Sequence, residues 1–109
     1  MISIVIHGTG RMAAAIAMAV AARGDVSITA LVGPQAPEWE TDIAWFSSLA
    51  DLPGESDLLI DFTLPEGTRA AASWCATNKV PLLSGVTGLP ADIFDYFGAV
   101  VGTRIVNKY

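Results

Sequence analysis

The sequence predicts an α/β fold, in which helices cover both faces of one doubly wound parallel sheet. Short runs of valine, isoleucine and leucine alternate with helix-like segments along the whole chain, an order typical of parallel strands joined by right-handed crossovers. Apolar residues make up 52% of the chain and the mean hydropathy is +0.50, as strands buried on both faces require. A chain of 109 residues is long enough for one hydrophobic core, so we expect a single domain, residues 1–109.

The first strand-helix-strand unit is the clearest part of the pattern. Residues 2–7 are mostly branched and apolar and predict a strand, and residues 11–23 are rich in good helix formers and predict a helix that ends at Gly24. Residues 26–32 alternate and contain β-branched side chains, which predicts the second strand. This unit forms the start of a parallel sheet.

The rest of the chain continues the alternation. The run Asp-Leu-Leu-Ile-Asp-Phe at 57–62 reads as a buried strand, and Pro65 suits the first turn of the next helix, where its missing N–H has no partner to lose. The elements expected after the second strand are, in order, a loop at 35–42, a short strand at 43–46, a turn or two of helix at 48–52, a strand at 57–62, a helix at 66–78, a strand at 80–84, a loop at 85–89, a short helix at 91–97 and a last strand at 103–106.

Composition excludes several classes of function. Eleven acids against six bases give a net charge of −5, the wrong sign for a nucleic-acid partner. The longest apolar stretch, residues 12–22, is shorter than the roughly 20 residues that span a bilayer, so we expect no membrane partner. A single cysteine, Cys75, and a single histidine, His7, cannot build a Cys/His metal site or a disulfide, which favours a cytoplasmic location.

The turn after the first strand carries a dinucleotide fingerprint. Gly8-x-Gly10-x-x-Ala13 lies between a predicted strand and a predicted helix. Gly8 would form the tight turn, Gly10 would let a pyrophosphate approach the backbone, and the small Ala13 would let the helix pack close to the sheet. The phosphates would then contact the unpaired amides at the positive end of the helix. The alternative is a tight turn that binds no ligand.

The choice between NADH and NADPH stays open in the sequence. An acid that binds the adenosine ribose is expected at the end of the second strand, where Gly33 stands instead. No carboxylate there would repel a 2′-phosphate, and Arg11 at the helix start could attract one, although it could equally be a solvated first-turn residue. His7, at the strand end, is interpreted as a histidine satisfied by the backbone rather than as a cofactor contact.

Three blocks together resemble a known family. The fingerprint GTGRMA, the block IDFTLPEGT at 60–68 and the loop SGVTG at 84–88 are similar, in order and spacing, to the N-terminal domain of 4-hydroxy-tetrahydrodipicolinate reductases, the dihydrodipicolinate reductases of lysine and diaminopimelate biosynthesis. The resemblance implies a Rossmann-like domain that binds NADPH or NADH. The cofactor-binding residues that it implies are Gly8, Thr9, Gly10, Arg11, Met12, Phe62, Thr63, Gly85, Val86 and Thr87.

The chain departs from the family pattern in four respects. The fingerprint turn is one residue shorter than the frequent form and has Ala13 in its third place, Gly33 replaces the acid, and Val86 removes a hydroxyl. The family's second domain, with a His-His motif, a lysine and a Ser-Gly-Thr segment for the small dicarboxylate substrate, is not in this sequence. We therefore expect dinucleotide binding by this chain, no catalytic residue within it and no reductase turnover without the second domain.

Two other functions remain open in the sequence. A non-catalytic Rossmann module could bind a dinucleotide or a partner, and an exposed last strand would favour self-association by edge pairing. Another two-domain dehydrogenase could share only the fold, although the IDFTLPEGT block argues against it.

Other chemically distinctive residues are assigned structural roles. Asp61 is expected to end a buried strand and Glu66 to favour a helix N-terminus, rather than to form an acid-base pair. Cys75 is expected to be a small buried apolar residue. Trp39 and Trp45 are interpreted as loop anchors that cover the core, with partner contacts as the alternative, and the acids at 38–42 as solvated surface.

Overall fold

The computed structural model, described here at residues 1–85 and 105–107, is built on one sheet of six parallel strands. The strands lie in the order β3-β2-β1-β4-β5-β6. Their bounds are Ile2–His7 for β1, Val26–Val32 for β2, Trp45–Phe46 for β3, Leu58–Asp61 for β4, Leu82–Ser84 for β5 and Ile105–Asn107 for β6. The helices are α1 (Arg11–Ala21), the 3₁₀ helix η1 (Leu49–Asp51) and α2 (Pro65–Asn78).

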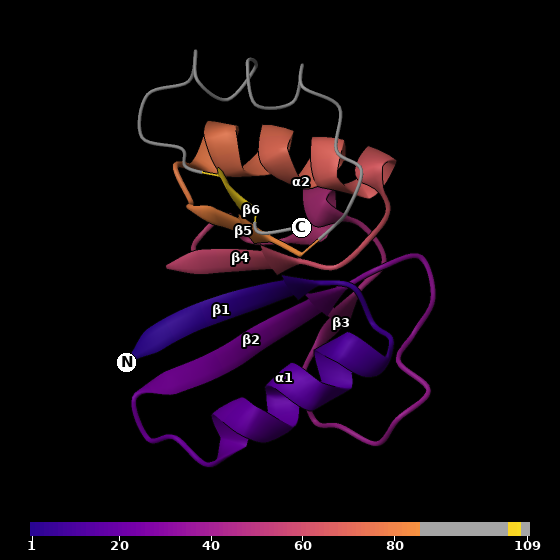
Figure 1. Cartoon of the computed structure of the whole chain (residues 1–109), viewed down its shortest axis with the longest axis vertical. Helices are drawn as coiled ribbons and strands as arrows, with labels where there is room; N and C mark the ends of the chain where they lie inside the picture. Colours follow the sequence, from indigo (N-terminus) through magenta and orange to yellow (C-terminus); the bar gives the residue numbers. More distant parts are fainter. Residues whose placement is uncertain (86–104, 108–109) are drawn as a thin grey trace.

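The chain winds outward from the centre of the sheet in two directions. It runs from β1 to β2 and β3 on one side, then returns to β4, beside β1, and continues to β5 and β6. Figure 1 shows α1 on one face of the sheet and α2 on the other. The predicted Rossmann-like α/β fold is therefore confirmed. The winding changes direction between β1 and β4, which in such sheets is where ligands bind.

The face under α1 is packed with large branched side chains. Ile4, Ile6, Leu31 and Ile60 form one buried cluster with Ala13 of α1, whose side chain is 1% exposed. A larger side chain at Ala13 would push the helix away from the strands, so the small residue expected in the fingerprint has this packing role. Each large apolar side chain buried here contributes about 1.5–3 kcal/mol to stability.

The face under α2 holds the second cluster. Val5, Leu59 and Leu82 of the sheet pack against Ala71 and Cys75 of the helix. Successive residues of a strand point to opposite faces, so Val5 lies under α2 while its neighbours in β1 lie under α1. By the same alternation, His7 and Asp61 share the face of Val5 and Leu59.

Most predicted elements are present, with shifted ends. α1 ends at Ala21 rather than residue 23: Ala22 is the C-cap, and the Arg23 N–H donates to the Val20 carbonyl at 2.9 Å, three rather than four residues back. Gly24 is thus not the cap of the helix. β3 is two residues long, β4 and β5 are shorter than expected, and the last strand is described at Ile105–Asn107. The predicted elements at 86–104 lie outside the described residues.

β3 and β6 are the outer strands of the sheet. Self-association through the β6 edge stays a prediction. Within the described part of the chain, neither α-helix has the length and apolar character needed to cross a membrane.

Cys75 gives a direct test of this packing. Burial, with a smaller effect of the nearby Asp61 charge, raises the pKa of the Cys75 thiol to about 12. We expect a disulfide reagent at pH 8 to modify the folded chain at least about a hundredfold more slowly than the chain in guanidinium chloride, because the reactive thiolate is rare in the folded state. Complete modification within minutes while the circular dichroism stays native would contradict the predicted packing of α2.

Candidate functional site

The turn between β1 and α1 leaves backbone amides open. Gly8 has φ of +140°, a conformation that a side chain disfavours, and its N–H donates to the Val32 carbonyl at 2.8 Å. Gly10 precedes α1 without a side-chain cap, and the first turn of this fully described helix contains no acid. No described atom lies within 4 Å of the position that a Cβ of Gly10 would take. An anion can therefore approach the first amides of α1, where the helix dipole favours it.

The loops that follow β1, β4 and β5 meet at one edge of the sheet. The Phe62 N–H donates to the His7 carbonyl at 3.0 Å, and the Gly85 N–H donates to the Asp61 carbonyl at 2.9 Å. A Cβ on Gly85 would overlap the Phe62 ring, so this ring lies directly over the glycine. The structure thus brings together the three segments on which the predicted contacts lie. Val86 and Thr87 lie outside the described residues.

The residues predicted to contact the cofactor differ in their exposure to solvent. Arg11 and Met12 are exposed at the start of α1, and Thr9 is half-buried, with its hydroxyl donating to the Gln35 carbonyl at 3.0 Å. The Thr63 hydroxyl points inward and donates to Asp61 at 2.7 Å. The Thr63 N–H donates to the same oxygen of Asp61 at 3.3 Å, so both polar donors of Thr63 have a partner within the protein.

A cavity of about 410 Å³ opens beside the fingerprint turn. Its lining residues come from that turn, from α1 and from the loop after β2, and they are Thr9, Gly10, Arg11, Ala14, Gln35, Ala36, Glu38 and Trp39. Glu38 is exposed, as expected for a residue of the solvated surface, and it also lines this cavity, which the sequence does not indicate. The only available signal was Trp39, whose indole N–H donates to the Thr9 carbonyl at 2.8 Å and holds the loop against the turn.

Both tryptophans of this loop region act as anchors. Trp39 packs on the core cluster under α1, and the Trp45 indole N–H donates to the Gly33 carbonyl at 3.0 Å. Gly33 itself is buried, and a Cβ there would lie 3.1 Å from the Thr9 methyl carbon. The position where an acid was expected is therefore closely packed against Thr9.

A buried polar cluster lies beneath the meeting loops. The Asp61 carboxylate is 0% exposed and accepts hydrogen bonds from the side chains of His7, Thr63, Thr68 and Ser84. His7 Nδ1 lies 3.1 Å from Asp61 Oδ1, and since an ionised carboxylate only accepts, Nδ1 is the donor. The interpretation of His7 as satisfied by the backbone is thus wrong: its partner is the side chain of Asp61, which lies opposite it on the adjacent strand β4 but 54 residues away in the sequence, so no local signal shows it.

The pKa of Asp61 reflects two opposing effects. Burial alone would raise it, but the hydrogen bonds from His7, Thr68 and Thr63 outweigh burial and hold the pKa of this carboxyl below its usual value. Asp61 ends β4, and Glu66 is exposed in the first turn of α2, as expected from the sequence. The Asp61 carboxylate is buried whereas Glu66 is exposed, in agreement with the structural roles assigned to them.

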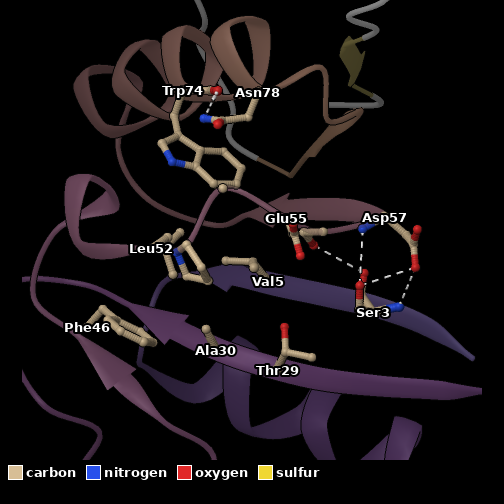
Figure 2. A pocket seen from close by; sticks show the side chains of 13 residues that line it. Ser3, Val5, Thr29, Ala30, Phe46, Leu52, Glu55, Asp57, Trp74 and Asn78 are labelled. Carbon is tan, nitrogen blue, oxygen red and sulfur yellow. Dashed lines mark hydrogen bonds between the residues drawn. The ribbon is translucent and has the colours of Figure 1, made fainter.

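A second cavity, of about 630 Å³, lies away from this edge (Figure 2). Trp74 of α2 points toward the sheet there, above Val5 and Leu52. Its rim carries the carboxylates Glu55 and Asp57, and no lysine or arginine is among its described lining residues. This cavity does not suit phosphates, although it is the larger of the two, so the edge beside Gly8 is the better candidate for a nucleotide.

Comparison with known proteins agrees with this geometry. Residues 2–99 match the family model described as dihydrodipicolinate reductase, N-terminus. The 4-hydroxy-tetrahydrodipicolinate reductase of Xylella fastidiosa strain 9a5c is 35% identical over 91 residues, which cover 79% of this chain and 38% of that protein. The chain thus spans about two fifths of the length of this curated relative.

Two solved structures share the fold. A dipicolinate-bound dihydrodipicolinate reductase from Paenisporosarcina sp. TG-14 superposes with a TM-score of 0.80 at 19% identity, over 97% of this chain and 47% of that one. The pyrroline carboxylate reductase of Plasmodium falciparum, solved with NADP bound, has a TM-score of 0.72 at 19% identity, over 97% of this chain and 41% of that one.

Asp61 predicts how stability depends on pH. Its pKa is lower in the folded chain than in the unfolded chain, where it is about 3.9, so its contribution is complete above that value and is lost as the pH falls through the folded-state value. Urea unfolding between pH 7 and pH 3 should show the free energy of unfolding falling at the acid end. Asp61→Asn should be less stable at pH 7, by about 3–5 kcal/mol if its donors are left unpaired, and should flatten this acid limb.

The control is Asp25→Asn, which removes an exposed carboxylate on the protein surface. It should keep most of the acid limb. Equal flattening by both substitutions would show that the limb does not report Asp61.

Proposed function

Because the chain belongs to the family of dihydrodipicolinate reductase N-terminal domains, we propose that it holds NADPH or NADH at the edge of the sheet where β1 and β4 end. The observation that carries the proposal is the uncapped start of α1 beside Gly8 and Gly10. A pyrophosphate there receives hydrogen bonds from amides that have no partner within the helix.

The two halves of the dinucleotide extend in opposite directions from this point. The adenosine half lies toward the cavity beside Thr9, Arg11 and Glu38. The nicotinamide half lies toward Phe62 and Gly85, at the ends of β4 and β5. We assign the pyrophosphate contacts to the backbone of residues 8–12 and the nicotinamide contacts to residues 62–63 and 85–87, as the family resemblance implies.

The same cavity supports acceptance of both cofactors. Arg11 offers a cation to the 2′-phosphate of NADPH, and the Glu38 carboxylate offers an acceptor to the 2′-hydroxyl of NADH. Gly33 places no charge at the end of β2. We propose that the balance between Arg11 and Glu38, rather than a residue on β2, sets the preference.

The reaction proposed for the whole protein is hydride transfer from the nicotinamide to a dehydrated cyclic dicarboxylate, in cytoplasmic lysine and diaminopimelate biosynthesis. The nicotinamide supplies the hydride when bound, and this chain positions it. A proton donor and groups for the substrate carboxylates are also required. We assign those groups to residues other than the ones described here, so turnover is expected only when they are present.

Gly10→Asp separates binding from folding. The position is open, and an aspartate before α1 would cap the helix, so stability should be unchanged or higher by roughly a few tenths of a kcal/mol. The same carboxylate would occupy the anion position and repel the pyrophosphate. We expect titration calorimetry to show NADPH and NADH binding to the parent chain and a loss of roughly a hundredfold or more in the variant, since a charge clash at a desolvated site costs several kcal/mol.

The matched control is Gly24→Asp, because no described atom lies within 4 Å of a Cβ there either. This variant should bind like the parent. Unchanged binding by Gly10→Asp would refute the proposed pyrophosphate position.

A pair of substitutions tests the assignment of the adenosine half. Arg11→Ala should weaken NADPH binding by roughly ten- to a hundredfold and NADH binding little, because a phosphate-guanidinium contact contributes about 1.5–3 kcal/mol. Glu38→Gln should shift the ratio of the two affinities toward NADPH, since it removes a charge that opposes the 2′-phosphate. Affinities measured by nucleotide fluorescence at constant ionic strength give both ratios, and parallel changes for the two cofactors would contradict the assignment.

A further inference from the structure

The Asp61 carboxylate is hydrogen-bonded to residues at the ends of β1, β4 and β5, the three strands whose loops meet at the candidate site. Oδ1 accepts from His7, the last residue of β1, and from the Thr63 N–H and hydroxyl in the loop after β4. Oδ2 accepts from Thr68 in α2 and from Ser84, the last residue of β5, at 3.4 Å. One side chain therefore links the ends of β1, β4 and β5 from below.

The backbone of the same residues completes the link. The Asp61 carbonyl accepts from Gly85, and the His7 carbonyl accepts from Phe62. The residues that contact Asp61 are thus immediate neighbours of Gly8, Phe62 and Gly85. A displacement of the carboxylate would therefore shift residues that lie only one or two positions from the fingerprint turn and from the loops after β4 and β5.

A buried charge is a poor choice if stability alone matters. Removing a carboxylate from water is expensive, and apolar residues of similar volume commonly replace buried ionic groups with no loss of stability. Asp61 and its partners lie on the face where Val5, Leu59 and Leu82 show that aliphatic packing is available. A carboxylate needs its hydrogen-bond donors at fixed positions. Its presence here therefore indicates that the relative positions of the segments that carry those donors are important.

We propose that Asp61 is a positioning residue for the dinucleotide: its carboxylate, through His7, Thr63 and Ser84, fixes the spacing of the three loops that receive the cofactor. This inference rests on the proposed dinucleotide site and deepens it. Asp61 touches no reacting atom, because it is 0% exposed. It acts on binding through the segments that it holds, chiefly through Oδ1, which faces the β1 and β4 segments.

The test compares two bonds to the same carboxylate. His7→Leu removes the hydrogen bond from β1, the strand that leads into the fingerprint turn. Thr68→Val removes the hydrogen bond from α2, a helix that contains no predicted cofactor contact. Neither residue is a predicted cofactor contact. Both variants should be less stable than the parent in urea unfolding, so a purely structural role would affect them alike.

Binding of NADPH should distinguish them. His7→Leu should weaken it by roughly tenfold, because small misplacements of binding groups have large effects, whereas Thr68→Val should stay within about twofold of the parent. Asp61→Asn, measured under conditions where it is folded, should weaken binding at least as much as His7→Leu. Equal affinities in the two single-bond variants, or losses in proportion to their stability, would overturn the proposal.

Amide chemical shifts measured by NMR without ligand test the positioning role of Asp61 independently of the proposed function. If the parent chain binds neither NADPH nor NADH, the proposed function fails, and the positioning role is decided without ligand. Amide shifts of Gly8, Gly10, Phe62 and Gly85 should then move in His7→Leu and stay in place in Thr68→Val. Unmoved amides in His7→Leu would overturn the role of Asp61 whether or not the chain binds a nucleotide.

Discussion

The buried charge of Asp61 constrains this structure more than any other single feature. A carboxylate in the middle of a sheet must be surrounded by donors, and a parallel sheet supplies them only where its strands end and hydroxyl-bearing loops begin. This explains why His7, Thr63 and Ser84 lie at the ends of three neighbouring strands. The donors outweigh burial and keep the pKa of the carboxyl low, so the charge is retained at neutral pH.

The glycines above this cluster follow from the same close packing. With the strand ends held together, the loops have little space, and Phe62 fills the gap between the fingerprint turn and Gly85. Gly67 is needed for a similar reason, because a Cβ there would overlap Thr63. The small residues of the three family blocks thus serve two needs. Some leave space for a ligand, as at Gly10, and others leave space for the protein's own side chains.

The sequence predicted the parallel sheet and the first strand-helix-strand unit well, because Ile2–His7 and Val26–Val32 have clear patterns bounded by glycine. Element ends were less predictable: the apolar run continues to residue 22, but α1 ends at Ala21, and the Arg23 N–H bonds only three residues back, to the Val20 carbonyl. The fingerprint turn was located from its glycines. The partners of His7 and the position of Glu38 depend on segments 54 and about 30 residues away that only folding brings together, so local patterns could not show them.

A net charge of −5 repels an anion at long range, yet it is compatible with a local anion-binding site. Charges on the exposed surface are screened over about 8 Å at physiological ionic strength, whereas the amides of α1 act at contact distance. The start of that helix carries the equivalent of about half a positive charge, and Arg11 adds a full one. A long polyanion would meet the acidic surface along its whole length, but a pyrophosphate meets only this turn. The net charge of the chain is therefore compatible with the proposed dinucleotide site.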